Sequence, residues 1–368
     1  MKVLFVINTI SMIYGGAQRM MAWVANAFAE NKYEVILFTH KNIKGPYYLL
    51  DKRIKHIHAD SISSVPIISP ILKIRHIIKN EKPNVVISFM EDSNLYCVLA
   101  ALRKKTPVVI CERSDPYSTT FWKNKISNKL MFLADGGVFQ LQRSADYFSN
   151  IRGPKVIIPN PIKEVSKCVT NSFEDRKDEI CYVGRISIEQ KRLDILLKAF
   201  IKVVKQFPSY KLVFYGDGPD KENLLNIAKE SSIEKSVCFK GFKAKPYEEI
   251  LNSKFFVLSS DYEGIPNSLM EAMNIGMTVI STDTSPGGAR FLIKNNINGL
   301  IVPTNDYNEL AKAIVYCINN PVHADEMGCN ARKSMSRFRE SKIKEMWFQY
   351  IYNFIKNEDR NNFYKTEI

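Results

Sequence analysis

Two glutamates, Glu263 and Glu271, stand eight positions apart in a segment whose residue types suit a phosphorylated ligand. The segment follows the apolar run Phe255–Leu258 and opens a helix at about Asn267. Gly264 permits backbone angles that other residues rarely adopt, so the loop can turn sharply into that helix. The first amides of a helix lack partners within the helix and lie at its positive dipole end. We therefore expect them to bind a phosphate.

The amides of Asn267 and Ser268 would meet that phosphate, and each glutamate would take a different part of the ligand. Glu271, one turn into the helix, is placed to accept hydrogen bonds from ribose hydroxyls. Glu263, on the loop, would face whatever the phosphate carries. An ordinary strand–turn–helix segment with a capping carboxylate would show the same spacing. The spacing alone therefore does not distinguish a ligand site from a purely structural segment.

Two cations, Arg185 and Lys191, follow another apolar strand, Ile180–Val183, and precede the helix Leu193–Phe200. In open α/β sheets the carboxyl ends of the strands face the ligand crevice. Two cations at that edge are suited to holding a diphosphate. Solvated charges on a loop are the alternative explanation.

Near the start of the chain, Gly15 and Gly16 separate the strand Val3–Ile7 from a helix that begins near Ala17. Glycines at such a turn let the backbone approach a phosphate closely. The pair does not form the G-x-G-x-x-G pattern of dinucleotide-binding loops, and a tight turn would explain it equally well.

Apolar runs rich in β-branched residues recur along the chain, with segments of helical period between most of them. This alternation predicts α/β architecture, with parallel sheets covered by helices on both faces. We expect two doubly wound, Rossmann-like domains that face a cleft, at residues 1–164 and 165–340, and a helix at about 341–368 that packs back on the first. The predicted strands are Val3–Ile7, Val35–Phe38, Val85–Phe89, Val108–Cys111 and Val156–Ile158, then Ile180–Val183, Leu212–Tyr215, Val237–Lys240, Phe255–Leu258, Met277–Ser281 and Leu300–Val302.

The composition is that of a globular protein, because 45% of the 368 residues are hydrophobic and 24% are charged. No apolar run is long enough for a membrane-spanning helix, and seven scattered cysteines fit reduced thiols in the cytoplasm. Much of the net charge of +14 falls in residues 1–164, which hold 23 Lys and Arg against 12 Asp and Glu. A basic half can attract nucleic acid, anionic lipid or a phosphorylated substrate, or simply keep the protein dissolved.

Taken together, these motifs resemble glycosyltransferase family 4, the retaining GT-B enzymes, over nearly the whole chain. The matching segments are Gly-Gly-Ala-Gln at 15–18, Val-Gly-Arg-Ile at 183–186 with Lys191, Tyr-Gly-Asp-Gly-Pro at 215–219, and the E-x7-E motif from Glu263 to Glu271. The resemblance implies a nucleotide-sugar donor, with UDP preferred, and retention at the anomeric carbon. No metal or other cofactor is expected, because Asp217 and Asp220 are three positions apart and form no D-x-D pair.

The resemblance also implies a role for individual residues. Arg185 and Lys191 would hold the donor's diphosphate and stabilise the leaving group, Glu271 would bind ribose, and Glu263 would contact the transferred sugar. The remaining donor-binding candidates lie in the matched motifs or beside the expected nucleobase, and Gly16 would close the phosphate site from the other domain. They are Gly15, Gly16, Gly184, Gly218, Phe242, Gly264, Asn267 and Ser268.

The chain departs from the family after the strand Val108–Cys111, where many relatives carry a histidine near the donor sugar. The sequence here is Glu112-Arg-Ser-Asp-Pro116. Glu112, Arg113 and Asp115 are therefore candidates for shaping sugar or acceptor choice, although a capped turn before Pro116 would explain the same residues.

For the acceptor, the segment Pro66–Lys79 mixes apolar and cationic positions from Ile71 on, as an interfacial helix would. Arg103-Lys104-Lys105 could add to the same face. We expect an enzyme that acts on a saccharide or lipid-linked saccharide, in the cytoplasm and in peripheral contact with an anionic membrane. A helix packed on the core with solvated lysines is the alternative.

The sequence thus predicts a metal-independent transferase of a hexose or N-acetylhexosamine in cell-surface polysaccharide synthesis, such as O-antigen or capsule. One alternative is a nucleotide-sugar 2-epimerase of the same architecture, which needs no acceptor. Another is a basic nucleic-acid-binding protein, although no recognisable nucleic-acid module is present, so we expect no nucleic-acid partner. A sugar-nucleotide sensor without catalytic activity is the third.

Overall fold

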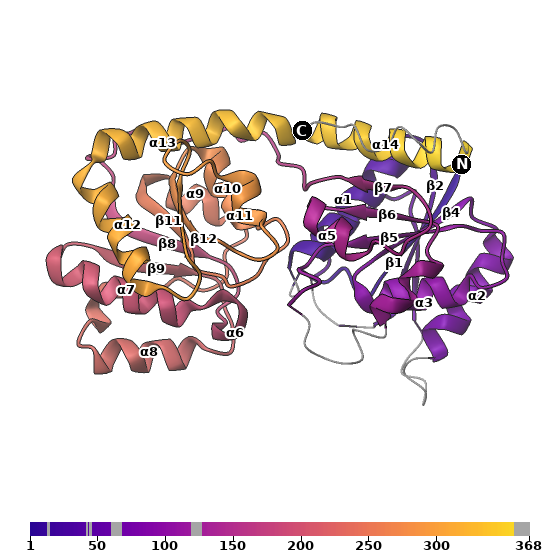
Figure 1. Cartoon of the computed structure of the whole chain (residues 1–368), viewed down its shortest axis with the longest axis horizontal. Helices are drawn as coiled ribbons and strands as arrows, with labels where there is room; N and C mark the ends of the chain where they lie inside the picture. Colours follow the sequence, from indigo (N-terminus) through magenta and orange to yellow (C-terminus); the bar gives the residue numbers. More distant parts are fainter. Residues whose placement is uncertain (13–14, 42, 44–45, 60–67, 119–126, 357–368) are drawn as a thin grey trace. The chain divides into compact units, whose positions relative to one another are not determined.

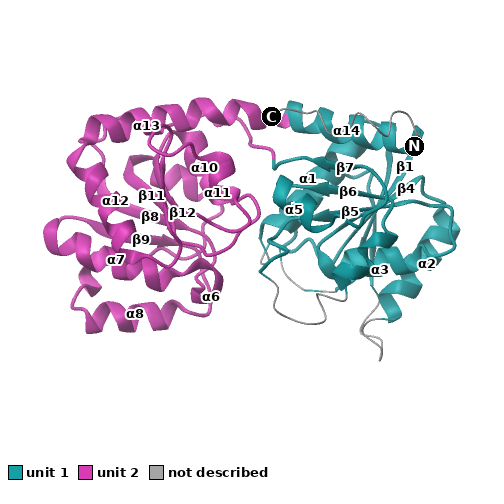
Figure 2. Cartoon of the chain, viewed as in Figure 1, with its two compact units in different colours: residues 1–160, 341–368 teal, residues 161–340 magenta. Residues whose placement is uncertain are grey.

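The computed structural model describes residues 1–12, 15–41, 43, 46–59, 68–118 and 127–356. Its contacts divide the chain into two units, coloured separately in Figure 2. Unit 1 comprises Met1–Asn160 together with the C-terminal segment from Ser341, and unit 2 comprises Pro161–Glu340. The boundary expected after residue 164 lies four positions beyond Asn160. Residues 66 and 67 of the expected interfacial helix and residues 357–368 of the expected C-terminal helix lie outside the described part of the chain.

Unit 1 is built on a sheet of seven parallel strands in the order β3-β2-β1-β4-β5-β6-β7. The central strand β1 pairs with β2 from Lys2 opposite Glu34, and with β4 from Val3 opposite Val85. The strands are β1 (Lys2–Ile7), β2 (Glu34–Thr39), β3 (Lys55–His58), β4 (Val85–Phe89), β5 (Val108–Glu112), β6 (Gly136–Phe139) and β7 (Lys155–Ile157).

Helices cover both faces of this sheet, which is why its central strands are continuous apolar runs (Figure 1). Alternate residues of β1 enter two different cores, with Phe5 against α1 and α14, and Leu4 on the side of α2 and α3. The helices are α1 (Gly16–Glu30), α2 (Ile68–Glu81), α3 (Glu91–Ala100), the 3-10 turn η1 (Leu130–Leu133), α5 (Gln142–Tyr147) and α14 (Glu340–Lys356).

Unit 2 carries six parallel strands in the order β10-β9-β8-β11-β12-β13. The strands are β8 (Lys177–Val183), β9 (Lys211–Tyr215), β10 (Val237–Phe239), β11 (Ser253–Leu258), β12 (Thr278–Thr282) and β13 (Leu300–Val302). The helices are α6 (Ile188–Lys191), α7 (Leu193–Gln206), α8 (Lys221–Glu230), α9 (Pro246–Glu249), α10 (Asn267–Ile275), α11 (Gly288–Leu292), α12 (Tyr307–Asn319) and α13 (Pro321–Ser334), with the short 3-10 turns η2 (Glu234–Ser236), η3 (Ile250–Asn252) and η4 (Met335–Phe338). Both units are therefore doubly wound, as the sequence predicts.

Two strands of unit 1 were not predicted from the sequence, β3 and β6. Strand β6 begins with two glycines, which are poor strand formers. A Cβ at Gly136 would lie 2.6 Å from the hydroxyl oxygen of Tyr350, so this position is kept small by the helix packed above it. Strand β3 holds His56 and His58, and both rings contact the hydroxyl of Thr39. His58 is exposed, whereas His56 is partly buried, and this burial lowers the pKa of His56 to about 4.

Candidate active site

The motif residues of unit 2 lie on loops that follow the carboxyl ends of neighbouring parallel strands. Arg185 and Lys191 follow β8, while Glu263 follows β11. These strands are adjacent in the sheet, yet the chain leaves β8 toward β9 on one side and reaches β11 on the other. Loops diverge at such a reversal of strand order, and open α/β sheets bind their ligands there. The fold therefore gathers the two motifs at one point.

At that point Lys191 forms an ion pair with Glu263. The ammonium of Lys191 donates a hydrogen bond to Oε1 of Glu263, which also accepts one from the Ser260 hydroxyl at 2.9 Å. Both charged side chains are mostly buried, with 19% and 12% of their surfaces exposed. The carboxylate is thus held in one orientation at the rim of the sheet.

Hydrogen bonds join the two loops along their length. The amide of Asp261 donates to the carbonyl oxygen of Gln190 at 3.0 Å, and the Gln190 side chain donates to the carbonyl oxygen of Tyr262 at 3.0 Å. The Ser259 hydroxyl donates to the carbonyl oxygen of Lys191 at 2.7 Å. Because both loops are fixed to each other, the Lys191–Glu263 pair is preorganised rather than a chance surface contact.

Arg192 adds a second set of ties beside the pair. Its backbone is left-handed, with φ of 49°, and its guanidinium bonds to Asp261, Asp194 and Asn305. The distance from Nη1 to Oδ2 of Asp261 is 2.8 Å. None of these partners was predicted from the sequence: Asp194 lies in the first turn of α7, Asp261 follows β11 and Asn305 follows β13. Arg192 thus ties three segments together beside the ion pair.

Arg185 stands at the end of β8 with its side chain exposed. Its carbonyl oxygen accepts a hydrogen bond from the buried Tyr182 hydroxyl at 2.9 Å, which fixes the backbone from which the guanidinium projects. The next turn is closed by Asp220, whose carboxylate accepts from the amide of Ile188 at 2.8 Å. Asp220 therefore caps α6, and this cap positions the stretch between the two cations.

Two glycines of unit 2, Gly184 and Gly218, stand where neighbouring atoms leave no room for a side chain. A Cβ at Gly218 would collide with the carbonyl oxygen of Ile186, and one at Gly184 would lie 2.7 Å from the Tyr182 hydroxyl. The amide of Ile186 donates to the carbonyl oxygen of Asp217 at 2.9 Å. The loops after β8 and β9 can therefore pack together only while these positions lack side chains.

Helix α10 opens directly after Pro266, so the first-turn amides at Asn267 and Ser268 lie at its N-terminus, as expected from the sequence. Glu271 lies one turn into the helix and is partly exposed. The loop ahead of it is tightly packed, because a Cβ at Gly288 would collide with the carbonyl oxygen of Gly264. The E-x7-E motif thus spans a rigid loop and the first turn of a nine-residue helix.

Phe242 follows β10 and is 71% exposed, which is unusual for a large aromatic side chain. It comes after Gly241, whose φ is 68°. Strand β10 is one of the two edge strands of the unit 2 sheet, next to β9. An exposed ring at the carboxyl edge of the sheet offers a flat face on which a nucleobase can stack.

In unit 1, Gly15 and Gly16 lie after β1 at the carboxyl edge of the other sheet. Gly15 has a φ of 106°, and a Cβ placed on it would meet no atom within 4 Å. Its strained backbone, rather than crowding, is what requires glycine there. Gly16 is the first residue of α1 and is exposed. Gln18, buried in the same helix, donates to Oδ1 of Asn8 at 3.3 Å and fixes the turn.

Glu112 and Asp115 both cap the turn that follows β5. Oε1 of Glu112 accepts hydrogen bonds from the amides of Arg113 and Ser114 and from the Ser114 hydroxyl, at 2.7 to 3.0 Å. Oδ1 of Asp115 accepts from the amide of Tyr117 at 2.9 Å. Of the two explanations that the sequence left open for these carboxylates, the geometry supports the capped turn.

Arg113 points into the core of unit 1. Its guanidinium lies 4.9 Å from the ring centre of Phe89 and 5.5 Å from that of Trp347, and Nη1 donates to the carbonyl oxygen of Ile158 at 3.2 Å. Only 9% of the residue is exposed, and its Nε and Nη2 atoms have no hydrogen-bond partner in the described part of the chain. Arg113 thus connects β5 to the end of β7 and to α14.

Glu91, which sequence reasoning missed, lies at the reversal of strand order in unit 1. It is the first residue of α3, directly after β4, and accepts a hydrogen bond from the Ser127 hydroxyl at 3.2 Å. Burial and the nearby Glu112 raise its pKa to about 7. Its place after a buried strand was the signal that could have identified it.

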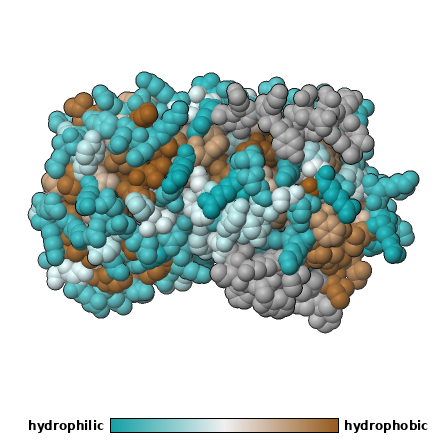
Figure 3. Space-filling model, in the orientation of Figure 1, coloured by the Kyte–Doolittle hydropathy of each residue, from teal (hydrophilic) through white to brown (hydrophobic). Residues whose placement is uncertain are grey.

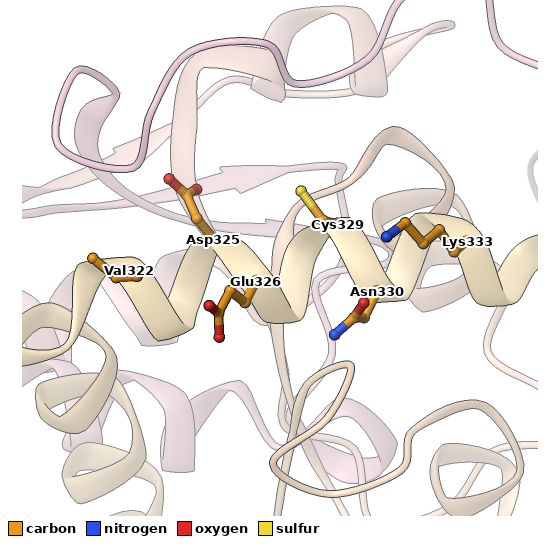
Figure 4. Close-up of a pocket in the computed structure, with 6 residues that line it drawn as sticks. All are labelled: Val322, Asp325, Glu326, Cys329, Asn330 and Lys333. Carbon is orange, nitrogen blue, oxygen red and sulfur yellow. The ribbon is translucent and has the colours of Figure 1, made fainter.

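A depression along α13 lies apart from these loops (Figure 4). Its lining residues come from a single helix, and Asp325 is already paired with Arg176 and with the amide of Phe173. It therefore offers no convergent polar groups to a ligand. Among the described residues, no group of three His, Cys, Asp or Glu side chains is arranged to hold a metal ion. Nor does any helix in that part of the chain have the length and apolar character needed to cross a membrane.

Comparison with known proteins matches both units to glycosyltransferase families. Residues 14–164 match the model described as Glycosyltransferase Family 4, and residues 169–334 match that of Glycosyl transferases group 1. The chain is 26% identical over 361 residues to the Campylobacter jejuni GalNAc-alpha-(1->4)-GalNAc-alpha-(1->3)-diNAcBac-PP-undecaprenol alpha-1,4-N-acetyl-D-galactosaminyltransferase, covering 95% of this chain and 98% of that enzyme.

Solved structures give the same fold. The lipopolysaccharide outer core galactosyltransferase WaaB superimposes with a TM-score of 0.77 at 20% identity, covering 98% of this chain and all of the other. Anabaena HepE in complex with UDP and glucose superimposes with a TM-score of 0.80 at 18% identity, covering 96% and 99%. Two family models that together span both units, and relatives aligned over nearly the full length, lead to one conclusion. The chain belongs to the group 1 glycosyltransferases of GT-B fold, of the bacterial polysaccharide type.

Proposed function

We propose that the protein transfers a hexose or N-acetylhexosamine from a nucleotide-sugar, with UDP as the preferred nucleotide, to a saccharide or lipid-linked saccharide. The observation that carries this proposal is the Lys191–Glu263 pair held at the strand-order reversal of unit 2, with Arg185 at the end of the neighbouring strand β8 and Glu271 on the helix that follows the loop of Glu263. A diphosphate needs cations, a ribose needs hydrogen-bond acceptors, and this edge of the sheet provides both.

Charge dictates the chemistry that these residues can perform. When the bond between the anomeric carbon and the diphosphate breaks, negative charge develops on the bridging oxygen. Preorganised cations stabilise such charge without reorganising during the reaction. We assign this role to Arg185 and Lys191, assign sugar contact to Glu263, and assign ribose binding to Glu271. The nucleobase would stack on Phe242, which is 71% exposed.

Two finer features complete the proposal. The acceptor hydroxyl attacks from the side on which the diphosphate leaves, so the configuration of the anomeric carbon is retained. The two cations replace a divalent metal, so transfer continues in excess chelator. Retention is checked by the anomeric coupling constant of the product, and metal independence by equal rates with EDTA and with added magnesium.

Two relatives support the choice of acceptor. The Campylobacter jejuni relative is named for a PP-undecaprenol-linked saccharide, and an Erwinia amylovora glycosyltransferase of amylovoran biosynthesis is 26% identical over 79% of this chain. We therefore propose a lipid-linked or polysaccharide acceptor of the O-antigen or capsule type. The enzyme would reach it by peripheral contact with the cytoplasmic face of an anionic membrane.

The test uses purified full-length protein and a panel of UDP-, GDP- and ADP-sugars without metal. Thermal shift and slow hydrolysis of the donor are measured for the wild type, Arg185→Ala and Glu271→Ala. We expect one donor to raise the melting temperature and both substitutions to remove that rise. Lys198→Ala on α7 and Glu222→Ala on α8 replace exposed charges elsewhere on unit 2 and serve as matched controls. Absence of a shift with every donor would refute the proposal, and formation of an epimerised sugar nucleotide without acceptor would favour the epimerase.

A further inference from the structure

The Glu263 carboxylate is held by two hydrogen bonds of different kinds. Among the described residues, the Lys191 ammonium and the Ser260 hydroxyl both donate to its Oε1, the hydroxyl at 2.9 Å. Lys191 is a cation, so an anionic ligand can draw it away from the carboxylate. Ser260 carries no charge, so a diphosphate exerts no comparable pull on it. The two bonds therefore respond differently to a nucleotide-sugar.

Ser260 is fixed in place from the neighbouring strand. The residue is fully buried, two positions after the end of β11. Its carbonyl oxygen accepts a hydrogen bond from the Thr282 hydroxyl, on β12, at 2.6 Å. Hydrophilic side chains are spread over the visible face of unit 2 (Figure 3), where water and salt screen their charges, but Ser260 lies beneath the surface. Its hydrogen bond to the carboxylate is therefore stronger than an exposed one would be.

The loop around Glu263 keeps its shape without the Ser260 hydroxyl. The amide of Glu263 donates to the carbonyl oxygen of Ser285 at 2.8 Å, and the amide of Ser285 donates to that of Asp261 at 3.0 Å. The amide of Asp261 in turn donates to the carbonyl oxygen of Gln190. Because these backbone hydrogen bonds already close the loop, the Ser260 hydroxyl holds the Glu263 side chain rather than the main chain.

Tyr182 has another buried hydroxyl close to Glu263, but this hydroxyl cannot replace that of Ser260. Burial and the Glu263 carboxylate raise the pKa of Tyr182 well above its ordinary value, so the hydroxyl keeps its proton. That proton is donated to the carbonyl oxygen of Arg185 at 2.9 Å. A hydroxyl has only one proton to donate. In the described part of the chain, Ser260 is therefore the uncharged donor to Glu263.

We propose that Ser260 is a positioning residue that keeps the Glu263 carboxylate aimed at the transferred sugar once the diphosphate has engaged Lys191. The inference rests on the proposed function, in which the donor's diphosphate binds Lys191 and a sugar hydroxyl binds Glu263. Without the serine hydroxyl, the carboxylate would lose both hydrogen bonds when the donor binds and could turn to other rotamers. A misplacement of about 1 Å can slow a reaction by on the order of 100-fold.

The experiment compares Ser260→Ala with a matched substitution at the other end of the same strand. Ser253, at the start of β11, is also buried, and its hydroxyl donates to Oε2 of Glu179 at 2.7 Å. Ser253→Ala therefore removes the same kind of hydrogen bond away from the proposed site. Ser260→Thr keeps a hydroxyl and tests for recovery.

Purified full-length proteins are compared in two assays. Donor hydrolysis is measured over a range of concentrations of the sugar nucleotide that raises the wild-type melting temperature most. Calorimetric titration with the corresponding nucleoside diphosphate (UDP, GDP or ADP) measures binding.

We expect Ser260→Ala to lower the kcat of donor hydrolysis by about 10-fold to 100-fold, with unchanged KM and nucleotide affinity. Ser253→Ala should hydrolyse the donor at the wild-type rate, and Ser260→Thr should regain most of the rate. In the Glu263→Ala background, Ser260→Ala should have no further effect, because no carboxylate is left to position.

The proposal fails if Ser260→Ala hydrolyses the donor as fast as the wild type, if it loses nucleotide affinity in proportion to its rate, or if Ser253→Ala is equally slow. It also fails if Ser260→Thr has the wild-type melting temperature and yet stays as slow as Ser260→Ala. A loss that adds fully to that of Glu263→Ala would show that Ser260 acts on the donor directly. A wild type that neither binds a nucleoside diphosphate nor hydrolyses any donor refutes the transferase proposal itself, whatever the variants do.

Discussion

Lys191 and Glu263 come from loops after two different strands, yet the lysine ammonium donates a hydrogen bond directly to the glutamate Oε1. The two charges therefore balance each other. In the proposed reaction, a diphosphate at this site would offer Lys191 a stronger anionic partner, and Glu263 would then be available to a sugar hydroxyl. The proposal therefore couples donor binding to the orientation of Glu263 through one ion pair.

Replacing Lys191 by alanine should lower both catalysis and stability. The pair is mostly buried, and the substitution leaves the Glu263 carboxylate without its cation, so we expect the free energy of unfolding to fall by about 1 to 3 kcal/mol. Loss of a cation beside the leaving oxygen should slow donor cleavage by roughly 100-fold to 1000-fold. Donor hydrolysis and chemical denaturation of Lys191→Ala measure the two effects, with Lys198→Ala as control. A wild-type hydrolysis rate in Lys191→Ala would contradict the role.

Substitutions of the two glutamates of the E-x7-E motif should affect different steps, with Glu263 acting on the rate of transfer and Glu271 on nucleotide binding. Glu263→Gln keeps the shape of the side chain and a hydrogen bond with the Ser260 hydroxyl, so we expect a lower kcat with nearly unchanged donor binding. Glu271→Ala removes the proposed ribose contact, so we expect weaker binding of free UDP as well. Calorimetric titration with UDP, compared with steady-state rates, separates them. Equal loss of UDP affinity in both variants would argue against separate roles.

Arg113 should prove to be a residue of the unit 1 core. Arg113→Ala leaves a cavity between Phe89 and Trp347, so we expect a loss of about 2 to 4 kcal/mol in the free energy of unfolding. Arg113→Met fills the same space and removes two buried donors that have no partner among the described residues, so it should cost less. Denaturation followed by tryptophan fluorescence measures both. If Arg113→Ala left stability unchanged and altered the choice of sugar or acceptor, Arg113 would be a specificity residue and not a core residue.

His40 should make unit 1 sensitive to mild acid. Burial lowers its pKa from 6.5 to about 4, and the ring contacts the Ser93 hydroxyl at 2.9 Å. Between these values the unfolded chain binds a proton that the folded unit does not, so stability falls as the pH drops from 6.5 toward 4. A shift of that size corresponds to roughly 3 kcal/mol.

The variant His40→Gln should show a smaller loss of stability over the same range of pH. Denaturant titrations at several pH values measure the difference, and His76→Gln, on the exposed side of α2, is the matched control. If the stability difference between the wild type and His40→Gln does not change with pH, burial of a neutral His40 is not the cause of any acid sensitivity.

Local pattern was sufficient to predict much of the fold. Buried parallel strands are continuous apolar runs, so β1, β4, β8 and β11 are visible in the sequence, and so are the cations and carboxylates that follow them. Strand β6 was missed because Gly136 and Gly137 weaken the pattern. The reason for glycine at 136 is the Tyr350 hydroxyl, a contact between segments far apart in the chain.

The sequence was also sufficient to predict the residues of the candidate site, but not the contacts between them. That Lys191 and Glu263 belong to one site follows from the motif, but their direct contact depends on β8 and β11 being neighbours in the sheet. Arg113 was named for its position in a polar turn, and nothing nearby in the sequence reveals that its side chain is covered by Trp347. Long-range packing decides the direction of such a side chain, and a local pattern cannot contain that information.

The division of unit 1 into two stretches of chain has a consequence for biosynthesis. Ile343, Trp347 and Ile351 belong to the core of unit 1, but the ribosome makes them only after all of unit 2. The apolar surface of β1 and α1 that these residues cover therefore stays exposed to solvent while unit 2, about half of the protein, is synthesised. Unit 2, by contrast, is continuous and can fold as soon as it emerges. We expect nascent chains that stop before α14 to need chaperones, although residues 1–160, which form most of unit 1, have already been synthesised.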